Sequence, residues 1–158
     1  MKTKYKIMKK LIYILSILFF ATMVSCGSKS NSKTDTEAVE TITHSITADG
    51  CYTDKDNVAL YIHTFNHLPP NYITKREAEA LGWISQKGNL NEVAPNKSIG
   101  GDKFGNFEGL LPKKKGRQYY ECDIDYEGGR RNAKRIVFSD DGLIYYTKDH
   151  YNSFEKLY

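Results

Sequence analysis

The sequence predicts an α+β domain in which two or three N-terminal helices pack on one face of a twisted antiparallel sheet of about five strands. Two observations lead to this class. Capping patterns and helically spaced apolar residues fill residues 51–94, whereas short strand-like runs separated by Gly, Asn and Asp turns fill residues 98–156. An antiparallel sheet covered by helices on one face leaves the other face free for a functional site.

Residues 1–25 have the pattern of an export signal. A lysine-rich start precedes an apolar run from Leu11 to Met23, and Ser25 and Cys26 follow. A small residue before a cysteine is typical of a bacterial lipoprotein signal, so Cys26 is expected to carry lipid, with plain secretion or an uncleaved anchor as alternatives. The predicted location is therefore exported: a membrane-anchored lipoprotein in the periplasm or at the cell surface, or a secreted protein.

Residues 26–50 combine the expected lipidation site with a flexible tether, because they are rich in Ser, Thr, Asn and Lys and contain few large apolar residues. The globular domain is expected at 51–158. The whole chain has a formal charge of +4, but the domain holds 16 Lys and Arg against 15 Asp and Glu, or +1. Net charge therefore gives no argument for a nucleic-acid ligand, and only local placement of charge can do so.

Three helices are expected in the first half of the domain. Thr53 is the expected N-cap of a helix that runs to about Asn66. A capping-box pattern at 74–77 predicts a second helix that stops at Gly82, and Lys75 then lies in its first turn, where backbone N–H groups also favour an anion. A shorter helix is expected at 89–94.

The second half of the domain has the sequence pattern of a β-sheet. Candidate strands cover residues 98–103, 118–125, 133–139, 143–147 and 154–156. Alternation along the second of these places Glu121 and Asp123 on one face and Cys122 on the other. Neighbouring carboxylates on a buried strand are costly unless cations meet them or chemistry needs them.

Glu121 and His150 are candidates for acid/base chemistry. A carboxylate and an imidazole have different intrinsic pKa values and can serve as base and acid at one pH. The alternative is that Glu121, like most strand glutamates, only faces solvent.

The basic residues Lys75, Arg131 and Arg135 can converge on a phosphate, since guanidinium forks match phosphate oxygens. Alternatively, the two arginines neutralise Asp123 and Glu121, and both interpretations can hold together. The lysines at 113–115 are expected to form a solvated loop.

Residues 105–109 form a short loop after Phe104, and Glu108 lies in it. A carboxylate that accepts two hydrogen bonds fits the Watson–Crick edge of guanine, and an aromatic ring can stack on a base. Zinc-spaced Cys/His clusters, P-loops and EF-hands are missing from the sequence, so neither a metal nor a cofactor is expected.

Two cysteines lie in the predicted domain. In an exported protein Cys51 and Cys122 can form a disulfide that closes a long loop, worth about 3–4 kcal/mol in the chain-entropy model. The alternative is a buried apolar Cys122 and a free thiol at Cys51. The sequence leaves both open.

Four stretches carry a resemblance to a known family: LPPNYITKREAEALGW at 68–83, KGNLNEVAPNKSIGGD at 87–102, GRRNAKRIVFS at 129–139 and LIYYTKDHY at 143–151. Together they resemble the barnase/binase family of small bacterial secreted ribonucleases, over about 51–158. The resemblance implies the microbial ribonuclease fold and metal-independent cleavage of single-stranded RNA after guanosine.

The resemblance also implies roles for residues. Glu121 matches the general base that takes the ribose 2′-OH proton, and His150 matches the general acid that protonates the leaving 5′-oxygen, which gives a 2′,3′-cyclic phosphate that is then hydrolysed. The remaining matches are cations that hold the phosphate (Lys75, Arg131, Arg135), the acid that orients those arginines (Asp123), an aromatic beside the site (Tyr151) and three residues of a guanine-binding loop (Phe104, Asn106, Glu108). Gly105 and Phe107 lie in the same loop and are expected to contact the substrate with it.

Two loop positions depart from the family pattern. Its best-known members carry Ser and Arg where this chain has Gly105 and Phe107, which leaves open the strictness of the guanine preference and the affinity for a barstar-like protein inhibitor. The expected partners are single-stranded RNA, a barstar-like inhibitor and the membrane through an N-terminal lipid, and the expected state is a monomer. A non-catalytic module that binds RNA or protein on the same fold is the alternative function.

Overall fold

The computed structural model describes residues 45–158. The expected signal segment, the lipidation site Cys26 and most of the tether lie outside the described residues. None of the helices within 45–158 is long and apolar enough to cross a membrane.

Helix α2 spans Lys55–Phe65 and begins one residue later than the sequence predicts. The predicted cap at Thr53 is wrong because the Asp54 carboxylate accepts the Asn57 backbone N–H at 3.0 Å, while the Thr53 carbonyl accepts from Asp125 in the strand region. The helix is capped at its C-terminal end by Asn66, whose φ of 59° is one that Asn tolerates better than most residues.

Helices α3 (Lys75–Ala80) and α4 (Leu90–Val93) are close to the predicted ones. The capping box at α3 is confirmed: the Thr74 side chain accepts the Glu77 backbone N–H, and the Glu77 carboxylate accepts the Thr74 backbone N–H at 2.8 Å. Gly82 follows α3 with a φ of 97°, as expected for a glycine that stops a helix.

The sheet within the described residues has six strands in the order β1-β2-β3-β4-β5-β6. Their bounds are β1 Tyr72–Ile73, β2 Ser98–Phe104, β3 Tyr119–Asp123, β4 Arg135–Ser139, β5 Ile144–Thr147 and β6 Glu155–Lys156. The five predicted strands are present and pair antiparallel with their neighbours. The sequence did not predict β1, which runs parallel to β2 and is too short to show an alternating pattern.

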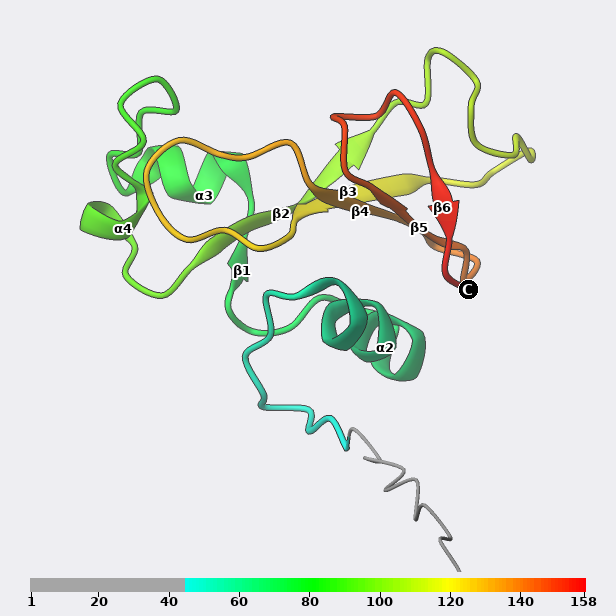
Figure 1. Cartoon of the computed structure of the whole chain (residues 1–158), viewed down its shortest axis with the longest axis horizontal. Coiled ribbons are helices and arrows are strands. Elements are labelled where there is room, and N and C mark those ends of the chain that lie inside the picture. The colour runs from blue at the N-terminus through cyan, green and yellow to red at the C-terminus, as the bar shows by residue number, and fades with distance from the viewer. Residues whose placement is uncertain (1–44) are drawn as a thin grey trace, which may run out of the picture. The chain divides into compact units, whose positions relative to one another are not determined.

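Helix α2 packs on one side of the sheet, as Figure 1 shows, and the α+β class is confirmed. Val58 and Ile62 of α2 form a core cluster with Cys122, Ile136 and Ile144. Helices α3 and α4 build a separate cluster at the β1–β2 end of the sheet. Its buried members are Ala78, Trp83, Leu90, Ala94 and Ile99.

The opposite face of β3 and β4 does not pack against α2. It packs against residues of the loops between β2 and β3 and between β5 and β6. Tyr119 and Val137 form a third cluster there with Leu111 and Tyr145. Glu121 shares this face, because it lies two residues after Tyr119 on β3 and pairs with Val137 on β4. The face that α2 leaves uncovered is therefore the one that carries the acidic residues of β3.

Both cysteines of the described part are free thiols. Cys122 is fully buried in the α2 cluster, whereas Cys51 is exposed. Of the two alternatives, the structure has the buried Cys122 and the unpaired Cys51.

Candidate active site

Glu121 lies in the middle of β3, and its side chain is only 9% exposed. Lys75 Nζ lies 2.5 Å from Glu121 Oε1, and the Tyr151 hydroxyl donates a hydrogen bond to Oε2. Burial alone would raise the pKa of Glu121, but the hydrogen bonds from Lys75 and Tyr151 outweigh it and hold that pKa below its ordinary value. Near neutral pH the carboxylate is therefore ionised and able to accept a proton.

A β-bulge in β2 places the Asp102 carboxylate on the same face of the sheet as Glu121. Gly100 pairs with Cys122 but Asp102 pairs with Glu121, so two residues of β2 oppose one of β3. Gly101, at the bulge, has a φ of 93°, a conformation that glycine adopts without steric cost. Without the extra residue, Asp102 would point to the α2 side of the sheet.

Asp102 fixes the start of α3. Its Oδ2 accepts a hydrogen bond from the Lys75 backbone N–H at 3.0 Å, which ties the first turn of α3 to β2. The N–H group that we expected to favour an anion is thus occupied by this carboxylate, and Lys75 reaches Glu121 with its side chain instead. Sequence reasoning missed Asp102, although two glycines before it within a strand are a signal for a bulge.

Asp123 holds two arginines on the same face. Its side chain is 1% exposed; Arg131 Nε and Nη2 lie 2.7 and 2.5 Å from its two oxygens, and Arg135 Nε lies 2.9 Å from Oδ1. Burial alone would lower the pKa of Arg131, but the contact with Asp123 outweighs it and raises that pKa. Asp123 thereby fixes both arginines, and one acid compensates two cations.

His150 lies in the connection between β5 and β6, and a hydrogen-bonded turn presents it to solvent. Thr147 Oγ1 donates to Asp149 at 2.9 Å and accepts the Tyr151 backbone N–H at 3.0 Å. Hydrogen bonds from the Ser153 side chain and backbone lower the pKa of Asp149 to about 2. His150 itself has a φ of 54°, and its backbone N–H donates to Ala133 O at 3.1 Å.

A cleft of about 510 Å³ brings His150 together with the two arginines that Asp123 holds. Arg130 also lines it, and its Nε donates to the Gln86 carbonyl at 3.2 Å. The Tyr151 ring, whose centroid lies 4.6 Å from that of His150, connects this cleft with Glu121 through its hydroxyl. The structure thus gathers Glu121, Lys75, Arg131, Arg135, His150 and Tyr151 into one region.

The expected guanine loop lies in the connection between β2 and β3, and its residues have unlike environments. Asn106 is buried, and its amide both donates to Leu111 O at 2.9 Å and accepts from Leu111 N at 3.0 Å. The Asn106 side chain therefore closes the loop. Phe104 packs on Tyr151, with ring centroids 5.1 Å apart, which joins the loop to the region around Glu121. Gly105, Phe107 and Glu108 are exposed.

The arrangement provides a buried ionised carboxylate, an accessible imidazole and fixed guanidinium groups within one basic region. A carboxylate and an imidazole on the two sides of a reacting group allow proton removal and proton delivery in one step. Guanidinium groups held in place stabilise an anion whose charge grows in the transition state. Within residues 45–158, no group of three His, Cys, Asp or Glu side chains is placed to hold a metal ion.

Comparison with known proteins gives consistent matches. A family model described as ribonuclease matches residues 55–158. A ribonuclease of Bacillus intermedius is 47% identical over 148 residues, which cover 91% of this chain and 91% of that protein. A ribonuclease of Heyndrickxia coagulans is 57% identical over 102 residues, 65% of this chain and 94% of that protein. The guanyl-specific ribonuclease St of Saccharopolyspora erythraea is 42% identical over 55 residues, 34% of this chain and 54% of that protein.

Proposed function

The chain belongs to the ribonuclease family, and from this premise we propose that it cleaves single-stranded RNA after guanosine by acid/base catalysis without a metal ion. The observation that carries the proposal is the buried, ionised Glu121, held by Lys75 and connected through Tyr151 to the cleft that contains His150. Base, acid and phosphate-binding cations thereby lie in one region of the surface.

In the first step the Glu121 carboxylate takes the proton of the ribose 2′-OH, and the 2′-oxygen attacks phosphorus. The bond from phosphorus to the 5′-oxygen breaks, and protonated His150 gives its proton to that oxygen. The product is a 2′,3′-cyclic phosphate. In the second step the roles reverse: His150 takes a proton from water, and Glu121 protonates the departing 2′-oxygen.

Lys75, Arg131 and Arg135 stabilise the phosphoryl oxygens as negative charge grows on them. Asp123 acts as a positioning residue for the two arginines, and Asp102 does the same for Lys75 through its backbone N–H. We assign guanine preference to the loop at Phe104–Glu108; a guanyl-specific relative supports the preference itself.

The dinucleoside monophosphate GpA tests the reaction. The parent is expected to release cyclic GMP and adenosine, to do so in the presence of a chelator, and to leave the 2′-deoxy analogue intact. Glu121→Ala and His150→Ala are each expected to lower the rate by about 10²- to 10⁴-fold, the usual contribution of general acid/base catalysis.

Two other outcomes would contradict the assignment. If both variants cleave as fast as the parent, the assigned residues are not the acid and base. If the parent binds RNA but releases no cyclic GMP, the chain is a binding module on this fold. Comparing GpA with ApA, CpA and UpA measures the base preference in the same assay.

Export and a lipid at Cys26 stay predictions from the sequence. Mass spectrometry of the chain purified from a bacterial membrane fraction, compared with Cys26→Ser, would test the lipid directly.

A further inference from the structure

A second concave surface lies in the connection between β2 and β3. It has a volume of about 480 Å³, and residues 104–107 form one wall while residues 112–114 and 117–119 form the other. All charged residues that line it are basic: Lys113, Lys114 and Arg117. It shares no lining residue with the cleft at His150, and residues 104–107 of its wall belong to the expected guanine loop.

The positive charge of this groove is only partly compensated. Asp141 accepts Lys114 Nζ at 3.0 Å and binds Arg117 in a two-point contact at 2.8 Å. One carboxylate thus faces two cations. Lys113 has no ion pair with any residue of 45–158 and is exposed, so its ammonium group is available to an anion.

Phe107 supplies an aromatic surface at the same groove. Its side chain is the most exposed of the large apolar residues described, at 90%. The ring lies directly over Gly105, and a Cβ at position 105 would collide with it. Gly105 and Phe107, the two positions that depart from the family pattern, therefore act as a pair, because the missing side chain makes room for the ring.

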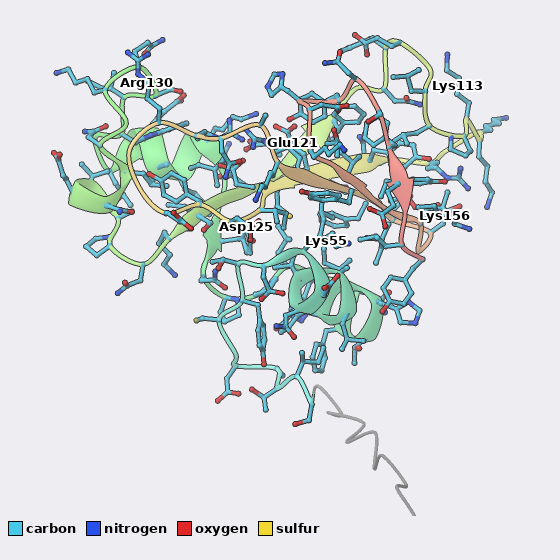
Figure 2. All side chains as sticks on the ribbon, in the orientation of Figure 1. Lys55, Lys113, Glu121, Asp125, Arg130 and Lys156 are labelled. Carbon is cyan, nitrogen blue, oxygen red and sulfur yellow. The ribbon has the colours of Figure 1, made fainter. Side chains whose placement is uncertain are left out.

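Exposed aromatic rings beside cations are the combination that binds single-stranded nucleic acid, since bases stack on the rings and phosphates pair with the cations. Figure 2 shows Glu121 between Arg130 on one side and Lys113 on the other. His150, which serves the leaving 5′-oxygen, lines the cleft on the Arg130 side. Under the proposed mechanism, the RNA 3′ of the cut lies on the side of that cleft, which leaves the side of Lys113 for the 5′ part.

We propose that this groove is a subsite for the nucleotide on the 5′ side of the cleaved guanosine. Phe107 stacks on the base of that nucleotide, and Lys113 binds the phosphodiester that joins it to the guanosine. The subsite rests on the proposed function, because guanosine must be bound at the loop that forms one wall of the groove for its 5′ neighbour to reach the rest of it.

The test compares kcat/KM for GpA, which cannot reach the groove, with kcat/KM for ApGpA, which can. For the parent we expect a ratio of about ten in favour of ApGpA, within the range that base stacking on an aromatic ring gives. Phe107→Ala is expected to reduce this ratio to about three, the part that Lys113 still supplies. Lys113→Gln is expected to reduce it about threefold and to weaken the salt dependence of ApGpA cleavage by about 0.7 in the log–log slope, as for one lost phosphate contact.

Lys156→Gln is the matched control, because Lys156 is exposed on β6 and does not line the groove. It should keep the parent's ratio. Equal kcat/KM of the parent on both substrates, or equal losses on both in Phe107→Ala, would overturn the subsite. Failure of the parent to release cyclic GMP from GpA would overturn the proposed function, and the subsite with it.

Discussion

At Glu121, burial and hydrogen bonding act on one carboxylate in opposite directions. The hydrogen bonds from Lys75 and Tyr151 prevail, so the pKa of Glu121 in the folded chain lies below its ordinary value of 4.5. A group whose folded pKa is lowered stabilises the fold above its unfolded pKa and loses that contribution as pH falls through the folded pKa. The same contacts that keep the base ionised therefore also favour folding near neutral pH.

Tyr151→Phe separates the effect of hydrogen bonding on the pKa of Glu121 from the effect of burial. The change removes the hydroxyl that donates to Glu121 and keeps the ring beside His150. Burial then has more weight, the pKa of Glu121 rises, and the acid limb of kcat/KM for GpA is expected to move to higher pH. Tyr126→Phe is the control, because its hydroxyl donates to the Gly129 carbonyl. A pH–rate profile whose acid limb stays in place would contradict the role of the Tyr151 hydroxyl.

Asp123→Asn tests whether the Asp123 carboxylate compensates the buried positive charge of Arg131 and Arg135. The side chain is 1% exposed, and neutralising it leaves Arg131 and Arg135 without their acid. Loss of one partner from a buried ion pair costs about 3–5 kcal/mol, so the free energy of unfolding in urea should fall by about that amount. Asp125→Asn is the matched control: Asp125 pairs with the half-exposed Lys134, a contact worth at most about 1 kcal/mol. Similar losses of unfolding free energy in both variants would show that Asp123 contributes no more to stability than the half-exposed pair of Asp125 and Lys134 does.

At the scale of helices and strands, the sequence predicts the features that depend only on local backbone conformation, such as the face of a strand on which a side chain lies. Alternation assigned Glu121 and Asp123 to one face of β3 and Cys122 to the other, because side chains alternate along a strand whatever its partner. Asp102 was missed because a bulge changes the pairing of β2 with β3 by one residue, and register depends on the partner strand. Nor could the pattern bring His150 near Glu121. Their roles came from the family resemblance.

Asn106→Asp tests whether the loop between β2 and β3 is preformed. The parent amide donates to Leu111 O and accepts from Leu111 N, and the carboxylate keeps only the acceptor. An unpaired buried carbonyl costs about 1–3 kcal/mol. We expect lower stability to urea and a higher KM for GpA, because the loop must then order on binding. Asn71→Asp is the matched control for the stability loss, because the buried Asn71 amide likewise donates to Tyr52 O and accepts from Tyr52 N, and Asn71 lies outside the loop. An unchanged KM in Asn106→Asp would mean that loop closure does not limit substrate binding.

At the scale of the whole domain, the folding core and the candidate site lie on opposite faces of β3. Cys122 belongs to the cluster that joins α2 to the sheet, while Glu121, the next residue toward the N-terminus, faces the site. Whether Cys122 pairs with Cys51 could not be read from the sequence, since a disulfide depends on the spatial separation of the two residues. In the structure the two thiols have different access to solvent: Cys51 is exposed and Cys122 is buried.

This difference predicts how the two thiols react with iodoacetamide. Cys51 should be alkylated in the native protein without a reductant, whereas Cys122 should react only as the α2 cluster opens, because burial excludes the reagent and raises the pKa of its thiol. Peptide mapping by mass spectrometry separates the labelled sites, and dithiothreitol should leave the urea midpoint unchanged. If Cys51 instead reacts only after reduction, the two cysteines are joined. A joined pair would require Cys51 to reach the interior of the α2 cluster, and the packing of α2 on β3 described above would then be wrong.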